Sequence, residues 1–223
     1  MHVLHPLLLV LGCAMFTHVM AQQPQGEYLE SKSKVAVVLA HGRGISPDGN
    51  VVGALRRDIH KELGFHTLSL QMPDTGADSL ESREVVAVFP EAYQRIQAAI
   101  DFLKKEKGVE RVYLMGHSMG GRMTSGFLAN NPDAGVAGFI GVGLVAGGKE
   151  PVNTNLNLRK VKLPVIDIYG DNDMDARAAS LRKPLVSERF VQVELRGAQH
   201  HYRRYEMPVA DAVIEWLKKQ EGK

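Results

Sequence analysis

One serine stands at the centre of a Gly-x-Ser-x-Gly pattern, Gly116-His117-Ser118-Met119-Gly120. The pattern follows an apolar run and precedes a helical one, which predicts a tight strand-to-helix turn. Such a turn forces its central residue into a strained backbone conformation, and glycines two positions away on either side avoid the resulting collisions. The N-terminus of the following helix favours negative charge near Ser118. A serine in this setting can attack a carbonyl carbon, so the pattern predicts Ser118 as a nucleophile.

A serine hydroxyl is a weak nucleophile and needs a base. The candidates are the histidines that follow the N-terminal apolar stretch: His41, His60, His66, His117, His200 and His201. His200 and His201 come after the 190–195 run, which is typical of a strand. His117 neighbours Ser118 in sequence, but the turn directs its side chain away from the nucleophile. His200 and His201 are therefore the base candidates.

An imidazole base works best when a carboxylate fixes its tautomer and stabilises its cation. Asp171 and Asp173 directly follow the apolar run 165–169. Asp167 lies inside that run, and we expect it to be a hydrogen-bonded residue of the core. Asp171 and Asp173 are the candidate acids.

These candidates need a scaffold that brings strand ends together, and the chain alternates apolar strand patterns with amphipathic helix patterns. The predicted strands are 35–40, 66–71, 111–115, 136–145, 165–169 and 190–195. Helical stripes begin near residues 52, 92, 119 and 209, and residues 22–33 are expected to be a short polar tail. Alternation of this kind predicts an α/β fold with a mostly parallel, twisted sheet of about six strands and helices on both faces. A ligand site then lies at the carboxyl ends of the strands.

The order Ser118, Asp173, His200 resembles that of the α/β-hydrolase superfamily, and the likeness covers residues 34–219. Members usually carry Gly-x-x-Asp at the acid turn, which Gly170 to Asp173 match. They often carry Gly-x-x-His at the base turn, which Gly197 to His200 match. The resemblance therefore favours Asp173 over Asp171 and His200 over His201.

An early His-Gly-x-Gly loop, His41-Gly42-Arg43-Gly44, is also similar to the family pattern. In relatives the amide after His-Gly pairs with the amide after the serine to bind an oxyanion. That role passes to the amides of Arg43 and Met119 here. Such donors stabilise the charge on a tetrahedral intermediate.

Two segments around the site bear on the substrate. Residues 147–164 form a short stretch where many relatives insert a helical lid, so we expect an open, lidless site that does not need a lipid interface. Residues 72–88 are polar and irregular, and form either part of the site rim or an ordinary surface loop. The first two strands of the full family fold are expected to be absent.

The N-terminus has the pattern of a secretory signal. Residues 7–16 are apolar or small, too few to span a bilayer, and Val19-Met20-Ala21 suits a signal peptidase, although Lys and Arg are absent before the apolar run. We expect a signal peptide over residues 1–21 and one α/β-hydrolase domain over residues 22–223. Residues 67–73 and 89–92 look like a small exported bacterial branch of the superfamily without a settled substrate. A bacterial periplasmic location is expected, with extracellular or lipid-anchored (through Cys13) alternatives.

Composition excludes several classes. The chain has 223 residues and a net charge of +2, without the basic surplus of a nucleic-acid binder. Its single cysteine, Cys13, lies in the predicted signal peptide, so the mature chain would have no disulfide and no cysteine-held metal. The run Gly143 to Glu150 nearly fits a phosphate loop, but a carboxylate stands where a hydroxyl is needed. We expect no cofactor, no metal and no stable membrane span.

The sequence thus predicts a serine hydrolase that cleaves carboxylic esters or thioesters of small molecules through an acyl-enzyme, with Ser118, His200 and Asp173 in the catalytic roles. A non-catalytic exported binding protein on the same scaffold and an amide or peptide hydrolase are the alternatives. The sequence leaves the acyl size and the oligomeric state open.

Overall fold

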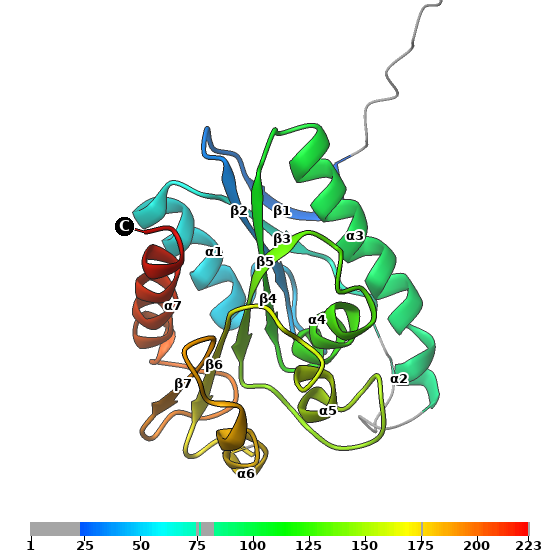
Figure 1. Cartoon of the computed structure of the whole chain (residues 1–223), viewed down its shortest axis with the longest axis vertical. Helices are drawn as coiled ribbons and strands as arrows, with labels where there is room; N and C mark the ends of the chain where they lie inside the picture. Colours follow the sequence, from blue (N-terminus) through cyan, green and yellow to red (C-terminus); the bar gives the residue numbers. More distant parts are fainter. Residues whose placement is uncertain (1–22, 75, 77–82, 175, 223) are drawn as a thin grey trace, which may run out of the picture.

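The computed structural model describes residues 23–74, 76, 83–174 and 176–222. It contains one seven-stranded sheet with the order β1-β3-β2-β4-β5-β6-β7 (Figure 1). All neighbouring strands are parallel except β1, which runs antiparallel to β3. The predicted α/β fold with a mostly parallel sheet is confirmed. The predicted signal peptide lies outside the described residues.

The predicted strands are all present, with small differences at their ends. Their observed bounds are β2 Val35–Ala40, β3 His66–Leu70, β4 Arg111–His117, β5 Val136–Val142, β6 Val165–Gly170 and β7 Phe190–Leu195. β5 ends three residues earlier than predicted because the chain turns at Gly143, whose φ is 54°. The following Leu144 and Val145 are buried without being part of the strand, so their apolar character extended the predicted run.

A seventh strand, β1 (Gly26–Leu29), occupies the segment expected to be a polar tail. The expectation that residues 22–33 form only a polar tail is therefore wrong, and β1 brings the sheet to seven strands. β1 is an edge strand with only one neighbour, so a short and half-polar sequence is sufficient to form it. Tyr28 anchors it by stacking on His66 and by meeting Phe102 edge-on, with ring centroids 5.9 and 5.7 Å apart.

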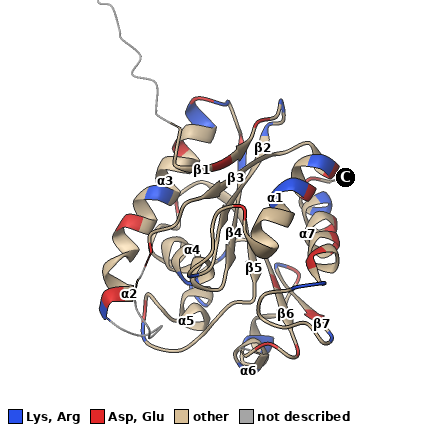
Figure 2. Cartoon of the chain, turned by 180° about the vertical axis from the view of Figure 1, so that it is seen from behind, with Lys and Arg blue, Asp and Glu red and all other residues tan. Residues whose placement is uncertain are grey.

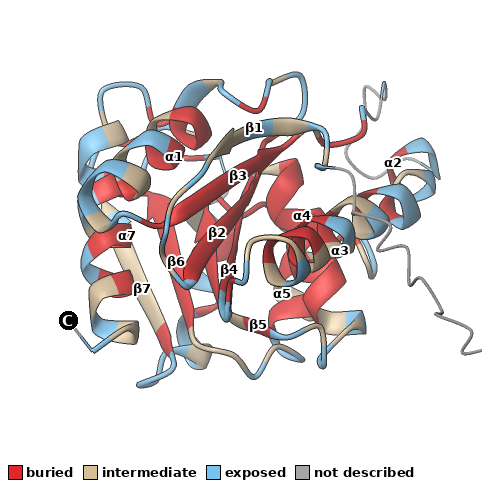
Figure 3. Ribbon diagram, turned by 90° about the horizontal axis from the view of Figure 1, so that it is seen from above, coloured by how far each residue is buried: buried red, intermediate tan, exposed pale blue. Residues whose placement is uncertain are grey.

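Helices cover both faces of the sheet (Figure 3). One apolar cluster lies under α1 and α7, and the other under α2, α3 and α4, so each face of the sheet has its own core. The helices are α1 Asn50–Leu63, α2 Arg83–Ala87, α3 Phe89–Lys105, α4 Met119–Asn130, α5 Thr154–Leu158, α6 Ala176–Ser180 and α7 Glu206–Gln220, with a 3₁₀ turn at Lys183–Leu185. Gly64 ends α1 in the left-handed conformation, φ 65°, as its position predicted.

The outer surface mixes both signs of charge. Acidic and basic residues are interspersed along α1, α3 and α7 (Figure 2). Among the described residues no helix has the length and apolar character needed to cross a membrane. Within residues 147–164, all of which are described, the only helix is the five-residue α5, so this segment contains no helical lid.

Candidate active site

The turn that carries the predicted nucleophile, Ser118, joins β4, at the centre of the sheet, to α4. Ser118 has φ 53° and ψ −116°, a conformation that a residue with a Cβ rarely adopts. A Cβ on Gly120 would lie 2.2 Å from the carbonyl oxygen of Ala40, and one on Gly116 would lie 2.6 Å from the Cα of Gly121. Both glycines are therefore needed for the backbone to close around Ser118, as the pattern predicted.

The structure brings Ser118, His200 and Asp173 into one hydrogen-bonded chain. The Oγ of Ser118 lies 2.8 Å from Nε2 of His200, and Nδ1 of His200 lies 3.0 and 3.1 Å from the two carboxylate oxygens of Asp173. Since a carboxylate only accepts, Nδ1 carries the proton and Nε2 is free to accept from the serine hydroxyl. The side chain of Asp173 is 1% exposed, whereas that of His200 is 14% exposed and so remains reachable.

The neighbouring candidates have other contacts. His201 is exposed, and its ring meets that of His200 edge-on at 5.7 Å. Asp171 is exposed and accepts a hydrogen bond from the amide of Gly197 at 2.6 Å, which ties the acid turn to the base loop. The structure thus brings His200 and Asp173 together with Ser118.

Asp167 lies in the core, as the sequence predicted. Its carboxylate receives hydrogen bonds from Nε and Nη2 of Arg182 at 2.8 and 3.0 Å, and from Gln192 at 2.8 Å. Both members of the ion pair are inaccessible to solvent, at 0% and 1% exposure. Arg182 could not be predicted as the partner from the sequence, because the two residues are 15 positions apart and belong to different elements.

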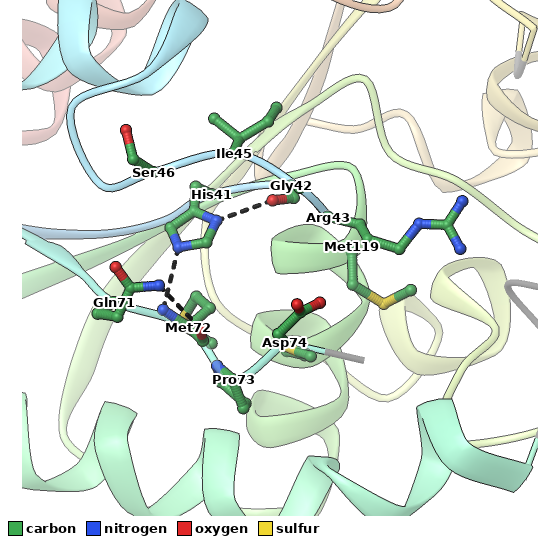
Figure 4. Close-up of a pocket in the computed structure, with 12 residues that line it drawn as sticks. His41, Gly42, Arg43, Ile45, Ser46, Gln71, Met72, Pro73, Asp74 and Met119 are labelled. Atoms are coloured by element: carbon green, nitrogen blue, oxygen red, sulfur yellow. Dashed lines mark hydrogen bonds between the residues drawn. The ribbon is translucent and has the colours of Figure 1, made fainter. Parts of the chain in front are cut away.

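The His-Gly loop after β2 is fixed by the buried ring of His41 (Figure 4). Nδ1 of His41 donates to the carbonyl oxygen of Gly42 at 2.8 Å, and Nε2 accepts from the amide of Met72 at 3.1 Å. Burial lowers the pKa of His41, which keeps Nε2 able to accept. The ring therefore clamps the loop to the end of β3, a role that the sequence did not indicate.

The lack of a side chain at Gly42 lets this loop pass close to Ser118. A Cβ on Gly42 would lie 3.1 Å from the Cβ of Ser118 and 3.1 Å from Nδ1 of His117. Arg43 is the next residue of this loop, and Met119 is the first residue of α4. Both residues line the same cavity.

That cavity has a volume of about 310 Å³. Its apolar lining comes largely from the buried methionines Met72, Met119 and Met123. In Figure 4 the carboxylate of Asp74 faces the middle of the cavity, whereas the guanidinium of Arg43 points away from it. Met72, Pro73 and Asp74 thus form part of the predicted rim, and residues 75 and 77–82 of that segment lie outside the described residues.

A second, shallower hollow of about 500 Å³ lies over the acid turn and the base loop and includes Asp173 and His200. Among the residues that the structure describes, no group of three or more histidine, cysteine or acidic side chains is placed to hold a metal ion.

A family model described as an alpha/beta hydrolase domain matches residues 33–212. No curated protein matches the sequence. Solved structures share the fold at low identity. Est1E from Butyrivibrio proteoclasticus is 19% identical with a TM-score of 0.68, and the match covers 84% of this chain and 88% of that one.

Two further solved structures match this chain with similar identity, TM-score and coverage. A dienelactone hydrolase from Anabaena variabilis is 20% identical with a TM-score of 0.64, covering 88% of this chain and 87% of that one. An α/β serine hydrolase without a lid, from Xanthomonas campestris, is 16% identical with a TM-score of 0.63, covering 88% and 86%.

Proposed function

Because this chain belongs to the α/β-hydrolase family, we propose that it is a serine hydrolase that cleaves carboxylic esters or thioesters of small molecules. The observation that carries the proposal is the unbroken hydrogen-bonded chain from Ser118 through His200 to Asp173. A binding protein on the same scaffold has no use for a strained serine joined to a base and a buried acid.

In the proposed reaction the Oγ of Ser118 attacks the carbonyl carbon while Nε2 of His200 takes the hydroxyl proton. Collapse of the tetrahedral intermediate breaks the bond to the leaving group, which receives that proton from His200. Water then attacks the carbonyl carbon of the acyl-enzyme and gives a proton to His200. The carboxylic acid is released as His200 returns that proton to the Oγ of Ser118. Asp173 keeps the Nδ1 proton in place and stabilises the imidazolium that forms in both steps.

Two backbone amides are proposed to bind the oxyanion. They belong to Arg43, on the loop clamped by His41, and to Met119, the first residue of α4. Amide donors fixed before the reaction stabilise developing negative charge without having to reorganise. The close approach of Gly42 to Ser118 supports this placement.

The cavity beside these amides is the proposed room for the acyl group. Its volume of about 310 Å³ suits a small acyl group, and its methionine side chains adapt to different shapes. The carboxylate of Asp74 disfavours anionic acyl groups here, while the outward guanidinium of Arg43 does not compensate within the cavity. Neutral acyl groups are therefore the proposed substrates.

The named neighbours support ester chemistry. Est1E has also been solved with ferulic acid bound, at 18% identity to this chain, and others are described as lipolytic enzymes and as an esterase domain. We further propose that the protein is exported, because residues 7–16 are apolar or small and Val19-Met20-Ala21 suits a signal peptidase.

Intact-mass analysis after treatment with a small fluorophosphonate tests the proposal, with the adduct located by digestion. A single adduct on Ser118, together with turnover of p-nitrophenyl acetate that the Ser118→Ala variant lacks, is the expected result. Unlabelled but folded protein, or near-wild-type turnover by Ser118→Ala, would contradict it and favour a binding role.

A further inference from the structure

One buried histidine of the site has no part in the proposed chemistry. His117 is the last residue of β4 and directly precedes Ser118, and its ring is 0% exposed. Its Nε2 donates a hydrogen bond to the backbone carbonyl oxygen of His200 at 2.9 Å. The nucleophile turn and the base loop, 83 residues apart in sequence, are therefore joined by a direct bond.

The ring also packs against the base itself. The centroids of the His117 and His200 rings lie 5.2 Å apart with planes tilted by 36°, and Tyr202 meets His117 edge-on at 6.1 Å. On its other side, Nδ1 of His117 faces Gly42, where a Cβ would lie 3.1 Å away. The side chain of His117, which directly precedes Ser118, thus lies against both the base loop around His200 and the His-Gly loop at Gly42.

Stability alone does not explain this choice of residue. Nδ1 of His117 is buried and has no hydrogen-bond partner among the described residues. A buried polar atom without a partner costs free energy that an apolar side chain of similar volume would avoid. The compensating feature is the bond to the His200 carbonyl, which no apolar side chain can make.

We infer that His117 is a positioning residue, which holds the backbone of His200 so that the base imidazole stays within hydrogen-bond distance of Ser118. The inference rests on the proposed function. A shift of about 1 Å between reacting groups can cost about 100-fold in rate, so one bond that fixes the spacing of nucleophile and base has a large effect.

The ring is suited to this role because it stays neutral. The pKa of His117 is lowered to about 4, chiefly by burial. The bond to the His200 carbonyl and the charge of Asp173 oppose this shift, whereas the nearby His200 and His201 add to it. A neutral ring places no second positive charge against His200 when that base accepts the serine proton.

The test compares His117→Leu, which removes the donor, with His117→Gln, whose terminal amide reaches the position of Nε2. His66 offers a matched control: it is 1% exposed, donates from Nε2 to the carbonyl of Ser33 and accepts on Nδ1 from Tyr28, at the opposite end of the strands. His66→Leu should lower thermal stability and leave kcat within about twofold.

Turnover of p-nitrophenyl acetate and the rate of fluorophosphonate labelling are measured for each variant. We expect His117→Leu to lose about 10- to 100-fold in kcat and in labelling rate with little change in KM, and His117→Gln to recover most of the loss. Folded His117→Leu protein with wild-type kcat and labelling would overturn the inference. So would an equal loss in the His66 control.

The NMR signals of the His200 ring can be measured without substrate, so they test the positioning role separately from the proposed function. In ¹⁵N-labelled protein, His117→Leu should change the ring signals of His200, and His117→Gln should leave them close to wild type. If wild-type protein is neither labelled nor active, the proposed function fails, and unchanged His200 signals in His117→Leu would then overturn the positioning role as well. Should His117→Leu not fold, His117→Met replaces it in both measurements.

Discussion

Nδ1 of His200 lies almost equally far from the two carboxylate oxygens of Asp173, at 3.0 and 3.1 Å. The bond closes a loop-to-loop contact between the ends of β6 and β7, and it directs Nε2 toward Ser118. Asp171, two residues earlier, instead binds the amide of Gly197. Two aspartates on one turn thus hold the same base loop, one through its side chain and one through its backbone.

Replacement of each aspartate by its amide should separate these contributions. Asp173→Asn cannot keep the proton on Nδ1 as the carboxylate does, so we expect kcat to fall by up to about 10⁴-fold. Asp171→Asn retains an oxygen that can accept from Gly197, so kcat should stay within a few-fold of wild type. The measurement is the rate of ester turnover by both variants, with circular dichroism as a control for folding. Equal losses of kcat in the two variants would contradict the assignment of Asp173 as the acid.

Ser118 should carry backbone strain that glycine relieves. Its φ of 53° and ψ of −116° cost of order 1–3 kcal/mol for a residue with a Cβ, whereas glycine tolerates them. Glycine also adds about 0.5–1 kcal/mol of chain entropy to the unfolded state. We therefore expect the free energy of unfolding, measured in urea, to be about 1 kcal/mol higher for Ser118→Gly than for Ser118→Ala. A less stable glycine variant would show that the turn is not strained.

Much of this arrangement could be predicted because each motif directly follows its own strand. In a parallel sheet the carboxyl ends of all strands meet at one edge, so Ser118, Asp173 and His200 had to approach one another once the strands were recognised. The glycines at 116 and 120 were informative for the same reason, since only a tight turn requires them.

The remaining features depend on contacts that no local pattern records. β1 is short and half-polar because it lies at an edge, so it lacks the apolar run of a central strand. The partnership of Asp167 with Arg182, and of His117 with the carbonyl of His200, joins residues from separate elements. Their chemistry becomes evident only when the three-dimensional fold places them together.

The stability of the protein should depend on pH through His117. Its pKa is lowered to about 4 in the folded chain and is about 6.5 when the chain unfolds. Between these values the unfolded chain binds more protons than the folded chain. The contribution of His117 to the free energy of unfolding is therefore fully present above about pH 6.5 and is lost as the pH drops toward 4. His117 alone should account for a loss of about 2 kcal/mol between pH 7.5 and 5.

The buried histidines His41 and His66 also have lowered pKa values, so the wild-type loss includes their contributions. His117→Gln removes one titrating group and keeps the donor. Urea unfolding of the two proteins at both pH values isolates the His117 share as the difference between their losses. An identical loss in the variant would show that His117 is not the group responsible.

The acyl cavity should discriminate by charge. Since the carboxylate of Asp74 faces the cavity, Asp74→Asn should raise kcat/KM for naphthyl succinate monoester relative to naphthyl butyrate. Asp74 is exposed, so we expect a change of only about threefold, which added salt should reduce. Asp133→Asn, an exposed substitution outside this cavity, is the control. An unchanged substrate ratio in Asp74→Asn would mean that the acyl group binds elsewhere.

The pair of Asp167 and Arg182 should support the fold without taking part in the reaction. Removal of one member leaves a buried charge without its partner, so Asp167→Ala or Arg182→Met should each lower the free energy of unfolding by about 3–5 kcal/mol. The double variant Asp167→Leu/Arg182→Met leaves neither charge behind and should lose less than the sum of the single variants. Because Arg182 also binds Asn155 and the carbonyl of Leu144, some loss remains. Folded single variants should label with fluorophosphonate at close to the wild-type rate, and loss of labelling without loss of stability would instead place Asp167 in the active site.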